Sequence, residues 1–537
     1  MISRIKIENY RRFRKLEVDF KDGLNILVGG NEAGKSTLLE AITLAITGRV
    51  RGQWAQEELH PYWFNRSTVE EFFAAYREDS TTAPPEILIE LFIESSSPDL
   101  IRQLQGTNNS ERKNTLGLQL QVKLDPAYAE EFVIYMQDQA VPELLPTDYF
   151  QVQWSSFRSP EQLRRKPHGF SLAQVDNRTL ASSYGVDYYT RQLLVENIEP
   201  TERARLATSL RIMRSQLGGD HLVQINEKLR LSDHSPHQLG VQLDQSSNAS
   251  WEAAVTPHID AVPFVMSGQA QQAFTKIELA MLRNQSDEGV ILVEEPENHL
   301  SHTRLRQLIE RLSQLAGDRQ LIMTTHNSFV LNRLGIDNLR LLEASTAAPL
   351  DALPAEDVAF FQRLPNFDTL RLVLADKVIL VEGPSDQLYI EHAFQALTDK
   401  SAAEHKVDVI AINGTSFARW FSLAKLLNKP IVGVRDNDEK PLKYWQEKYR
   451  QSMGSRAQLF VGDPIHGKTL EPQILSANQS NLDELRRVLG VEKEKELEEW
   501  MTKNKTEAAF ALASPTADLN FPQYIKDAVG AVKGISG

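Results

Sequence analysis

The sequence predicts an α/β protein whose strands lie mostly in parallel sheets, and three stretches of the chain carry this prediction. The apolar run 24–28 ends in two glycines and is followed by a helical pattern. A helical pattern at 269–282, a buried strand at 290–293 and a further helix and strand give an alternating order over 269–323. From residue 377 onward, three strands are each followed by a helical pattern. This alternation is typical of parallel sheets covered by helices.

Length, charge and composition limit the classes of protein to which the chain can belong. At 537 residues it is too long for one hydrophobic core, and we expect roughly three or four domains. With a formal charge of −13, the chain would hold a nucleic acid through local basic surface and bound metal rather than through a global positive field. The absence of cysteine excludes disulfides, thiolate zinc sites and cysteine nucleophiles. Since no signal-peptide pattern opens the chain and no run approaches about 20 apolar residues, we expect a cytoplasmic protein without membrane contact.

A glycine-rich loop follows the first of the predicted strands. Residues 29–37 fit the pattern G-x-x-x-x-G-K-[ST] in the strand, loop and helix context that this pattern requires. Glycines let backbone N–H groups curl around phosphate oxygens, and the start of the helix adds the positive end of its dipole. A glycine turn that merely joins strand and helix is the alternative. We predict an ATP and Mg²⁺ site whose contacts in this loop are Gly29, Asn31, Gly34, Lys35 at the β- and γ-phosphates, Ser36 on Mg²⁺, and Thr37.

Consecutive carboxylates end the buried strand 290–293. Such charge at a buried strand tip is costly unless a cation or a reaction needs it. We predict that Glu294 lies in the Mg²⁺ shell and that Glu295 polarises the attacking water, because phosphoryl transfer depends on positioning and charge compensation. A later strand, 321–323, leads to His326 at a strand end of the kind where such sheets hold ligands, although a capping or surface histidine is the commoner interpretation.

Together these motifs resemble the ABC ATPases of the DNA-repair and SMC-like branch. The resemblance implies that His326 is the switch histidine and that Ser267 and Gly268 belong to a signature loop that contacts ATP, although the family's Ser-Gly-Gly-Gln pattern is only partly matched. Glu294 stands where the family usually has aspartate, which implies slower hydrolysis. An ABC site needs a signature loop from a second ATPase and this chain encodes only one. We therefore expect a homodimer or a homotetramer.

Four acidic residues at the ends of predicted strands form a second group. Glu382 ends one strand and Asp386 opens the helix that follows it. Asp436 and Asp438 follow another strand, and a spacing of two sends both carboxylates to one side if the chain stays extended. Carboxylates from adjacent strand ends can converge on Mg²⁺ or Mn²⁺. Each element alone also fits an acidic helix start or a solvated loop.

The order of these acids, with the turn Asn413-Gly414 between them, resembles the Toprim domain shared by topoisomerases, primases and some nucleases. Downstream, Thr469-Leu470-Glu471 and Asn504-Lys505-Thr506 resemble two further elements of the OLD (overcoming lysogenization defect) family of ATP-dependent endonucleases, in which an ABC ATPase is fused to Toprim. The resemblance covers nearly the whole chain and is closest to the class found in Gabija-type anti-phage defence. It implies that Glu471 completes a two-metal cluster and that Lys505 stabilises charge on the scissile phosphate.

Periodicity and resemblance together give the expected domains. Helical spacing at Leu206, Leu210, Met213 and Leu217 indicates an inserted helical region whose apolar stripe offers a pairing surface or packs within its own domain. The expected order is an ABC ATPase part at 1–154, a helical dimerisation insertion at 155–247, a second ATPase part at 248–348, a linker at 349–375 and a Rossmann-like Toprim nuclease domain at 376–537.

The implied activity is that of a nucleotide-regulated, divalent-metal-dependent DNA endonuclease or nickase. Two ions held by the five acids would activate a water and steady the leaving 3′ oxygen. The alternative is an ATP-dependent DNA clamp or sensor whose Toprim domain does not cleave. Arg158, Arg164, Arg165 and Lys166 are candidates for DNA contact, or form a solvated basic linker. The resemblance also implies a UvrD-type helicase in one setting, and a reverse transcriptase with its DNA product in another, as partner.

Overall fold

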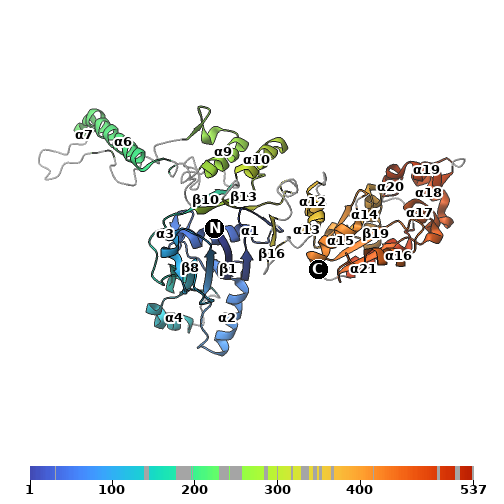
Figure 1. The fold of residues 1–537 in the computed structure, drawn as a ribbon, viewed down its shortest axis with the longest axis horizontal. Coiled ribbons are helices and arrows are strands. Elements are labelled where there is room, and N and C mark those ends of the chain that lie inside the picture. The colour runs from blue at the N-terminus through green and yellow to red at the C-terminus, as the bar shows by residue number, and fades with distance from the viewer. Residues whose placement is uncertain are drawn as a thin grey trace. The chain divides into compact units, whose positions relative to one another are not determined.

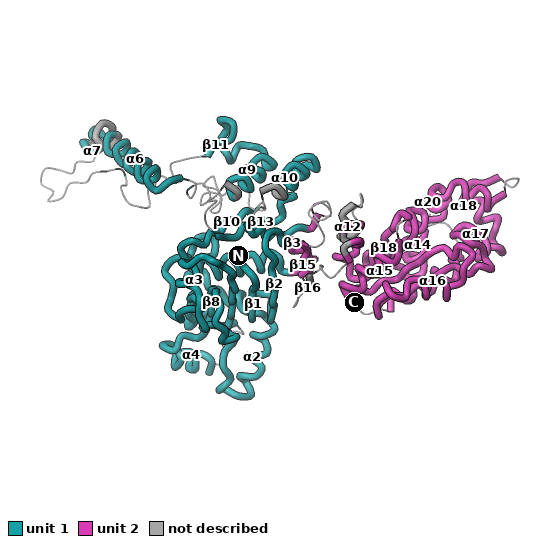
Figure 2. The backbone as a smooth tube through the Cα atoms, viewed as in Figure 1, with its two compact units in different colours: residues 1–25, 34–325, 344–346 teal, residues 26–33, 326–343, 347–537 magenta. Residues whose placement is uncertain are grey.

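The computed structural model of the chain contains two compact units, drawn as a ribbon in Figure 1 and coloured separately in Figure 2. Residues 1–25, 34–325 and 344–346 form the first unit, and residues 26–33, 326–343 and 347–537 form the second. No helix in the described part of the chain is long and apolar enough to cross a membrane. The structure describes all residues except 31, 138–143, 177–194, 196–197, 229–240, 242, 244–256, 283–287, 299, 316–318, 328–329, 331–337, 343–346, 350–353, 364–367, 415, 493–495, 514–519 and 535–537.

An antiparallel sheet in the first unit covers the helix that follows the glycine-rich loop. Its strands alternate buried and solvent-facing side chains, as a sheet with one wet face requires. Helix α1 (Lys35–Thr47) packs against β6 and β8 and buries Leu38, Leu39 and Ile42. The strands run in the order β2-β1-β6-β8-β7 with β9 also on β8, and their bounds are β1 (Ile2–Tyr10), β2 (Phe13–Asp19), β6 (Ile87–Ile93), β7 (Gln105–Gly106), β8 (Thr115–Leu124) and β9 (Phe150–Ser156).

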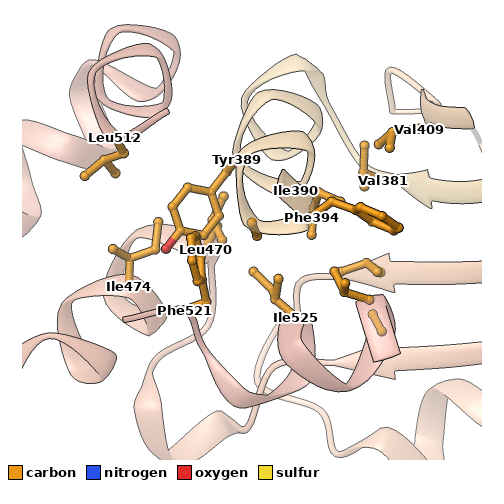
Figure 3. Close-up of a cluster of buried hydrophobic side chains, with 14 of the residues drawn as sticks. Val381, Tyr389, Ile390, Phe394, Val409, Leu470, Ile474, Leu512, Phe521 and Ile525 are labelled. Atoms are coloured by element: carbon orange, nitrogen blue, oxygen red, sulfur yellow. The ribbon is translucent and has the colours of Figure 1, made fainter. Parts of the chain in front are cut away.

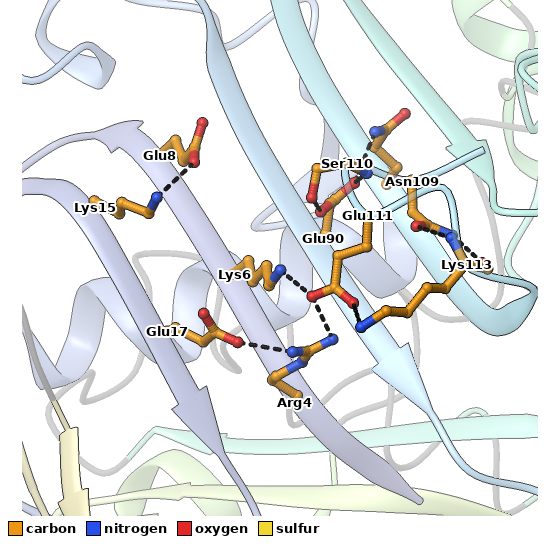
Figure 4. A network of polar contacts seen from close by, with 11 residues as sticks. Arg4, Lys6, Glu8, Lys15, Glu17, Glu90, Asn109, Ser110, Glu111 and Lys113 are labelled. Carbon is orange, nitrogen blue, oxygen red and sulfur yellow. Dashed lines mark hydrogen bonds and ion pairs between the residues drawn. The ribbon is translucent and has the colours of Figure 1, made fainter. Parts of the chain in front are cut away.

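An ion network lies on this sheet around Glu111 (Figure 4). Arg4 on β1 contacts Glu17 on β2 at 2.8 Å and Glu111 at 2.9 Å, and Lys113 contacts Glu111 at 2.9 Å. Lys6 also pairs with Glu111. The hydrogen bonds from Lys6 and Lys113 lower the pKa of the Glu111 carboxyl to about 2. These pairs join neighbouring strands and loops at a modest gain in stability.

Three parallel strands of the first unit carry the second acidic motif. β10 (Phe170–Asp176), β13 (Glu288–Glu294) and β14 (Gln320–Thr324) are neighbours, and their registers place Asp176, Glu294 and Thr324 side by side at the carboxyl ends. β13 and β14 are buried along most of their length because helices flank parallel sheets, and α9 (Gln269–Leu282) packs on β10 and β13. Figure 1 shows α9 and α10 (His302–Leu315) beside these strands. The predicted strands at 290–293 and 321–323 are confirmed.

The segment 155–247, expected to be a helical insertion, also contains a strand of the ATPase sheet. β10 lies inside it and pairs with β13 along its whole length, so an insertion that begins at 155 is wrong for residues 170–176. Ser171, Ala173 and Gln174 weaken the apolar pattern by which a buried strand is recognised. Helix α6 (Pro200–His221) and helix α7 (Val223–Lys228) are present as expected. Much of the remaining insertion, at 177–194 and 229–240, lies outside the described residues.

The apolar stripe on α6 is largely exposed in the single chain. Of the stripe residues, Leu206 is 39% exposed and Met213 49%, while Leu210 is half-buried; Ile212, outside the stripe, is also exposed. The side chain of Leu217 lies outside the described residues. These exposures do not favour packing of the stripe within its own domain. The first unit also contains β4 (Arg49–Val50), β5 (Gln53–Trp54), α2 (Arg66–Glu78), α3 (Pro98–Leu104), α4 (Ala129–Met136), β11 (His258–Ile259) and β12 (Val262–Pro263).

The second unit contains a four-stranded parallel sheet in the order β18-β17-β19-β20. The chain leaves β17 for β18 on one side and returns to β19 on the other. The carboxyl ends of β17 and β19 therefore form a topological switch point, where open α/β sheets bind ligands. The strands are β17 (Lys377–Val381), β18 (Val407–Ala411), β19 (Ile431–Arg435) and β20 (Ala457–Val461).

Helices of the second unit enclose a continuous core on this sheet. Figure 3 shows Ile390 and Phe394 of α14 near Val381 of β17 and Val409 of β18. The helices are α12 (Ala355–Arg363), α13 (Asp368–Leu374), α14 (Pro384–Thr398), α15 (Phe417–Leu426), α16 (Leu442–Tyr449), α17 (Leu470–Ala477), α18 (Leu482–Leu489), α19 (Leu497–Lys503), α20 (Lys505–Leu512) and α21 (Gln523–Gly534). Elsewhere in this unit β3 (Leu24–Val28) pairs in parallel with β15 (Leu339–Leu342), and β15 pairs with β16 (Ala347–Pro349).

Candidate functional site

The switch point of the second unit gathers the predicted acids. Glu382 follows β17, and Asp386 lies in the first turn of α14, where its Oδ2 accepts a hydrogen bond of 2.9 Å from the Gly383 backbone N–H. Asp436 follows β19, the neighbour of β17. Glu471 is buried in the first turn of α17. Like-charge repulsion connects Asp436 to Asp386, Glu382 and Glu471, so four of the five predicted acids belong to one cluster.

Burial and mutual repulsion disfavour the charged forms of these acids. Burial, with repulsion from Asp386, Glu382 and Glu471, raises the pKa of the Asp436 carboxyl to about 8. Burial raises the pKa of Asp386 to about 6, against the opposing hydrogen bond from the Gly383 N–H. The pKa of Glu382 is also raised, mainly by burial and less by its acidic neighbours. Such a cluster is stabilised by a cation.

Lys505 supplies one positive charge. Its Nζ lies 3.2 Å from Glu471 Oε1, while Thr469 Oγ1 donates a hydrogen bond of 2.7 Å to the other Glu471 oxygen. Burial lowers the pKa of the Lys505 ammonium, but the combined attraction of Glu471, Asp436 and Asp386 outweighs this effect and the pKa is raised. Lys505 is therefore a charged ammonium held against the acids, about half exposed.

Arg435, the last residue of β19, supplies a second positive charge that the sequence analysis missed. Its Nη2 lies 3.1 Å from Glu382 Oε1 and donates to Asp438 Oδ2 at 2.7 Å. Its Nη1 donates to the Tyr449 hydroxyl at 2.7 Å, and the guanidinium lies 3.3 Å from the centre of the Trp445 ring. The available signal was an arginine immediately before Asp-x-Asp at a strand end, where a charge needs a partner.

Asp438 departs from its expected position. The chain does not stay extended after Asp436, because Asp438 has a φ of 47° and Asn437 is fully buried. The side-chain Nδ2 of Asn437 donates to the Gly467 carbonyl at 2.6 Å, and the backbone carbonyl of Asn437 accepts from Trp445 Nε1 at 3.0 Å. The expectation that both carboxylates point to one side of a strand required an extended chain, and the chain is not extended here. Asp438 is 57% exposed and pairs with Arg435.

The donor set fits a hard divalent cation, and one atom of the structure supports this fit. Glu382 Oε1 is buried without a hydrogen-bond partner among the described residues, and its contact with Arg435 is an ion pair only. Carboxylate oxygens are the preferred ligands of Mg²⁺ and Mn²⁺. Within the described part of the chain, no three acidic or histidine side chains already lie close enough to share one ion.

The first unit brings the predicted phosphate-loop and acidic residues together. Ser36 Oγ donates a hydrogen bond to Glu294 Oε1, which joins the two residues predicted to hold Mg²⁺. Lys35 is buried, and burial lowers its pKa against the attraction of Glu295, Glu297 and Glu294. Glu295 has a φ of 45°, and its backbone N–H donates to the Thr324 carbonyl at 3.1 Å. Carboxylates therefore lie near Lys35, which is predicted to bind the phosphates.

The glycines of the loop are needed for different reasons. At Gly34, φ is 91° and a Cβ would lie 2.5 Å from a ring carbon of Phe13. At Gly29, a Cβ would lie 2.6 Å from the Ala33 Cβ. Thr37 lies in the first turn of α1. The predicted contact Asn31 lies outside the described residues.

Four further residues concern the ATPase interpretation. Ser267 and Gly268 precede α9, whose first turn is closed by hydrogen bonds from the Gln271 and Gln272 N–H groups to the Gly268 carbonyl. His326 is exposed, two residues beyond the end of β14. Glu297, to which the sequence analysis gave no role, is buried and accepts a hydrogen bond of 2.7 Å from Thr325.

Family models match both parts of the chain. A model described as "AAA domain" matches residues 4–158, and a second AAA-domain model matches residues 263–332. A model described as "Overcoming lysogenization defect protein-like, TOPRIM domain" matches residues 373–438. The chain therefore carries an AAA-type ATPase domain followed by an OLD-like TOPRIM domain, and the predicted α/β fold class is confirmed.

Individual proteins match more locally. The DNA double-strand break repair Rad50 ATPase of Methanopyrus kandleri is 57% identical over 49 residues, which are 9% of this chain and only 6% of that protein. An ATP/GTP phosphatase of Helicobacter pylori is 22% identical over 350 residues, 61% of this chain and 85% of that protein. The C-terminal region of the Xanthomonas campestris pv. campestris OLD protein matches at 19% identity with a TM-score of 0.23, over 30% of this chain and 92% of that structure. The domain assignment depends on the family models, because these matches are short or distant.

Proposed function

We propose that the chain is a nucleotide-regulated, divalent-metal-dependent DNA endonuclease or nickase of the OLD type. The observation that carries this proposal is the cluster at the switch point. There Lys505 lies beside Glu471 and is also attracted electrostatically by Asp386 and Asp436. Such an arrangement suits cleavage of a phosphodiester, because the acids can hold metal ions and the fixed positive charge of Lys505 can face the phosphate.

In the mechanism that we propose, a bound Mg²⁺ or Mn²⁺ would supply compensation of the phosphate charge and activation of a water. Glu382, Asp386, Asp436, Asp438 and Glu471 would hold two such ions. Lys505 stabilises the negative charge that develops on the scissile phosphate, since an ammonium fixed in place needs no reorganisation during the reaction. Arg435 positions Glu382 and Asp438 through its two ion pairs.

The ATPase domain regulates this site in our proposal. Lys35 and the backbone of Gly29, Asn31 and Gly34 bind the phosphates, and Ser36, Thr37 and Glu294 complete the Mg²⁺ and phosphate contacts. Glu295 polarises the attacking water, and its hydrogen bond of 2.8 Å from Asn298 Nδ2 holds the carboxylate. His326 acts as the switch histidine, and Ser267 and Gly268 close the site of a second copy.

We further propose a cytoplasmic homodimer or homotetramer that acts in anti-phage defence of the Gabija type. A UvrD-type helicase, or a reverse transcriptase with its DNA product, is the proposed partner. The exposed Leu206, Ile212 and Met213 on α6 support self-association, because a helix with an apolar stripe in water gains by pairing. The domain limits that we propose are those expected from the sequence, with β10 added to the ATPase.

One observation favours a second candidate, a DNA clamp or sensor that does not cleave. Arg435 neutralises part of the charge on Glu382 and Asp438 through its ion pairs with them. If this arrangement persisted in solution with divalent ions present, the TOPRIM domain would bind DNA through Arg435 and Lys505 and lack hydrolytic activity.

A plasmid-nicking assay separates the two functions. Purified protein is incubated with supercoiled DNA and Mg²⁺ or Mn²⁺, with and without ATP. We expect nicking by the wild type and none by Glu382→Ala or Asp436→Ala, with ATP binding preserved in both. Glu391→Gln is the matched control, because Glu391 is exposed on α14 and outside the cluster. Equal nicking by all variants would exclude the proposed site, and DNA binding without cleavage by the wild type would support the clamp.

A further inference from the structure

Two cavities in the first unit share Trp54 and Arg164 in their walls, and neither contains a residue of the predicted ATP site. One has a volume of about 240 Å³ and the other of about 270 Å³. Their shared walls come from β5 and from the segment between β9 and β10. The 240 Å³ cavity also includes Thr43 and Thr47, near the end of α1 opposite to Lys35.

The 240 Å³ cavity is strongly basic. Among the described residues that line it, five are cationic and none is acidic, in a chain whose formal charge is −13. The position of Arg49 is well defined, because its Nη1 donates to the Gly52 carbonyl at 3.0 Å and its guanidinium lies 4.2 Å from the centre of the Trp54 ring. The cationic residues are Arg49, Arg51, Arg164, Arg165 and Lys166.

The nearby end of α1 does not offset this charge. A helix C-terminus carries roughly half a negative charge. Here the Gly48 N–H donates to the Leu44 carbonyl at 2.8 Å and Thr47 Oγ1 donates to the Thr43 carbonyl at 2.7 Å, so part of this end is already satisfied. The charge of the five positive side chains exceeds this partial negative charge several-fold. The cavity therefore suits a phosphate group.

The 270 Å³ cavity has a different chemistry. The amides of Gln56 and Gln162 in its wall already bond to backbone groups of β9, at 2.7 Å to the Val152 N–H and at 2.9 Å to the Trp154 N–H. Trp154 Nε1 donates to the Ala45 carbonyl at 2.8 Å. Apart from Arg164, the wall then consists mainly of indole rings and aliphatic groups, which favour a flat apolar group.

We propose that the two cavities form a second nucleoside-phosphate site, separate from the ATP site. The base lies against Trp54 in the apolar cavity, and the phosphate lies among Arg49, Arg164 and Arg165 in the basic cavity. Trp54 and Arg164 line both cavities, and one nucleotide contains both chemical groups. The nucleoside phosphate comes either from a free nucleotide or from the 5′ end of a DNA strand.

Calorimetry on the full chain tests this site. The Lys35→Ala background removes the proposed ATP site from the measurement, and EDTA prevents metal-dependent cleavage. The probes are AMP, adenosine, and a single-stranded oligonucleotide with and without a 5′-phosphate. We expect AMP or the 5′-phosphorylated oligonucleotide to bind, and the Arg164→Gln/Arg165→Gln double variant to weaken this binding by roughly tenfold or more.

Two further variants separate the parts of the site. Trp54→Leu is expected to weaken AMP binding while leaving binding of inorganic pyrophosphate, a probe without a base, unchanged. Arg66→Gln is the matched control, because Arg66 is an exposed arginine of the same unit that lines neither cavity. Binding of AMP without the oligonucleotide assigns the site to free nucleotides, and the reverse assigns it to DNA ends.

Three results would overturn the proposal. The first is that neither AMP nor the 5′-phosphorylated oligonucleotide binds. The second is that adenosine binds as well as AMP, or that the oligonucleotide binds equally without its 5′-phosphate. The third is that Arg66→Gln weakens binding as much as the double variant does. None of these results depends on the nuclease site, so the proposed endonuclease activity is tested separately.

Discussion

Removing one charge from the acidic cluster should stabilise the metal-free protein, although it damages the proposed metal site. Burial and acidic neighbours raise the pKa of Asp436 to about 8, from a usual value of 3.8. When the pKa of a carboxyl is higher in the folded than in the unfolded protein, its full contribution to stability is present only at pH values below the unfolded pKa. This contribution is lost as the pH rises through the folded pKa. In wild type, this loss of stability therefore occurs between about pH 4 and pH 8. Asp436→Asn avoids the loss because its side chain carries no charge.

The structure sets the size of the effect. At about 1.36 kcal/mol per pH unit, the difference between 3.8 and about 8 corresponds to at most roughly 6 kcal/mol. Lys505 lies beside the cluster, and protons redistribute among neighbouring carboxylates when one of them is lost. We therefore expect about 2 kcal/mol at pH 9, or roughly 30-fold slower amide exchange in β19.

Hydrogen exchange read by mass spectrometry measures this locally, which suits a chain with two compact units. Wild type and Asp436→Asn are compared in EDTA at pH 5 and at pH 9, with Glu391→Gln as the control. The extra protection should be largest at pH 9 and much smaller at pH 5, where only the first part of the loss has occurred. Mn²⁺ should protect the wild type more than the variant. Faster exchange in the variant at pH 9, or a difference independent of pH, would refute the electrostatic argument.

Other consequences follow from the first unit. Lys35→Ala should lose ATP binding in calorimetry, since it removes the cation expected at the β- and γ-phosphates; unchanged affinity would refute the phosphate-loop role. Glu111→Gln should lower stability by about 1 kcal/mol at pH 7. Since the pKa of Glu111 is lowered to about 2, this difference should vanish as the pH falls through that value, and denaturant titration at both pH values checks it. Leu206→Glu with Met213→Glu should reduce self-association. Light scattering that finds a 60.7 kDa wild-type monomer, with and without ATP and DNA, would contradict the expected dimer.

The sequence was sufficient to locate the acids because strand order and periodicity constrain where strands end. Glu382 and Asp436 each follow an apolar run, and such runs become neighbouring parallel strands whose carboxyl ends meet. The Ser36 and Glu294 pair was predictable for the same reason, since a phosphate loop and an acidic strand end belong to one kind of site. In both places a local pattern of about ten residues contains the information.

Other features depend on contacts that no local pattern contains. Asp438 leaves the strand direction because Asn437 bonds to Gly467, which lies 30 residues further along the chain. β10 was expected to be helical because Ser171 and Gln174 hide its pattern, yet its pairing with β13 determines its structure. Tertiary contacts override local preference in both cases.

Arg435 shows how such a contact changes the interpretation of the whole site. From the sequence, the acids form a group with one lysine nearby, and a metal is needed to compensate most of their charge. In the structure, a buried guanidinium between Trp445 and Tyr449 already contacts Glu382 and Asp438. The carboxylates of Asp386 and Asp436 form no ion pair with Arg435, whose Nε donates only to the Asp436 backbone carbonyl, and these are the acids whose pKa values are raised to about 6 and about 8. The strongest demand for a divalent ion therefore lies at Asp386 and Asp436, near Lys505, where the proposed cleavage chemistry also places the scissile phosphate.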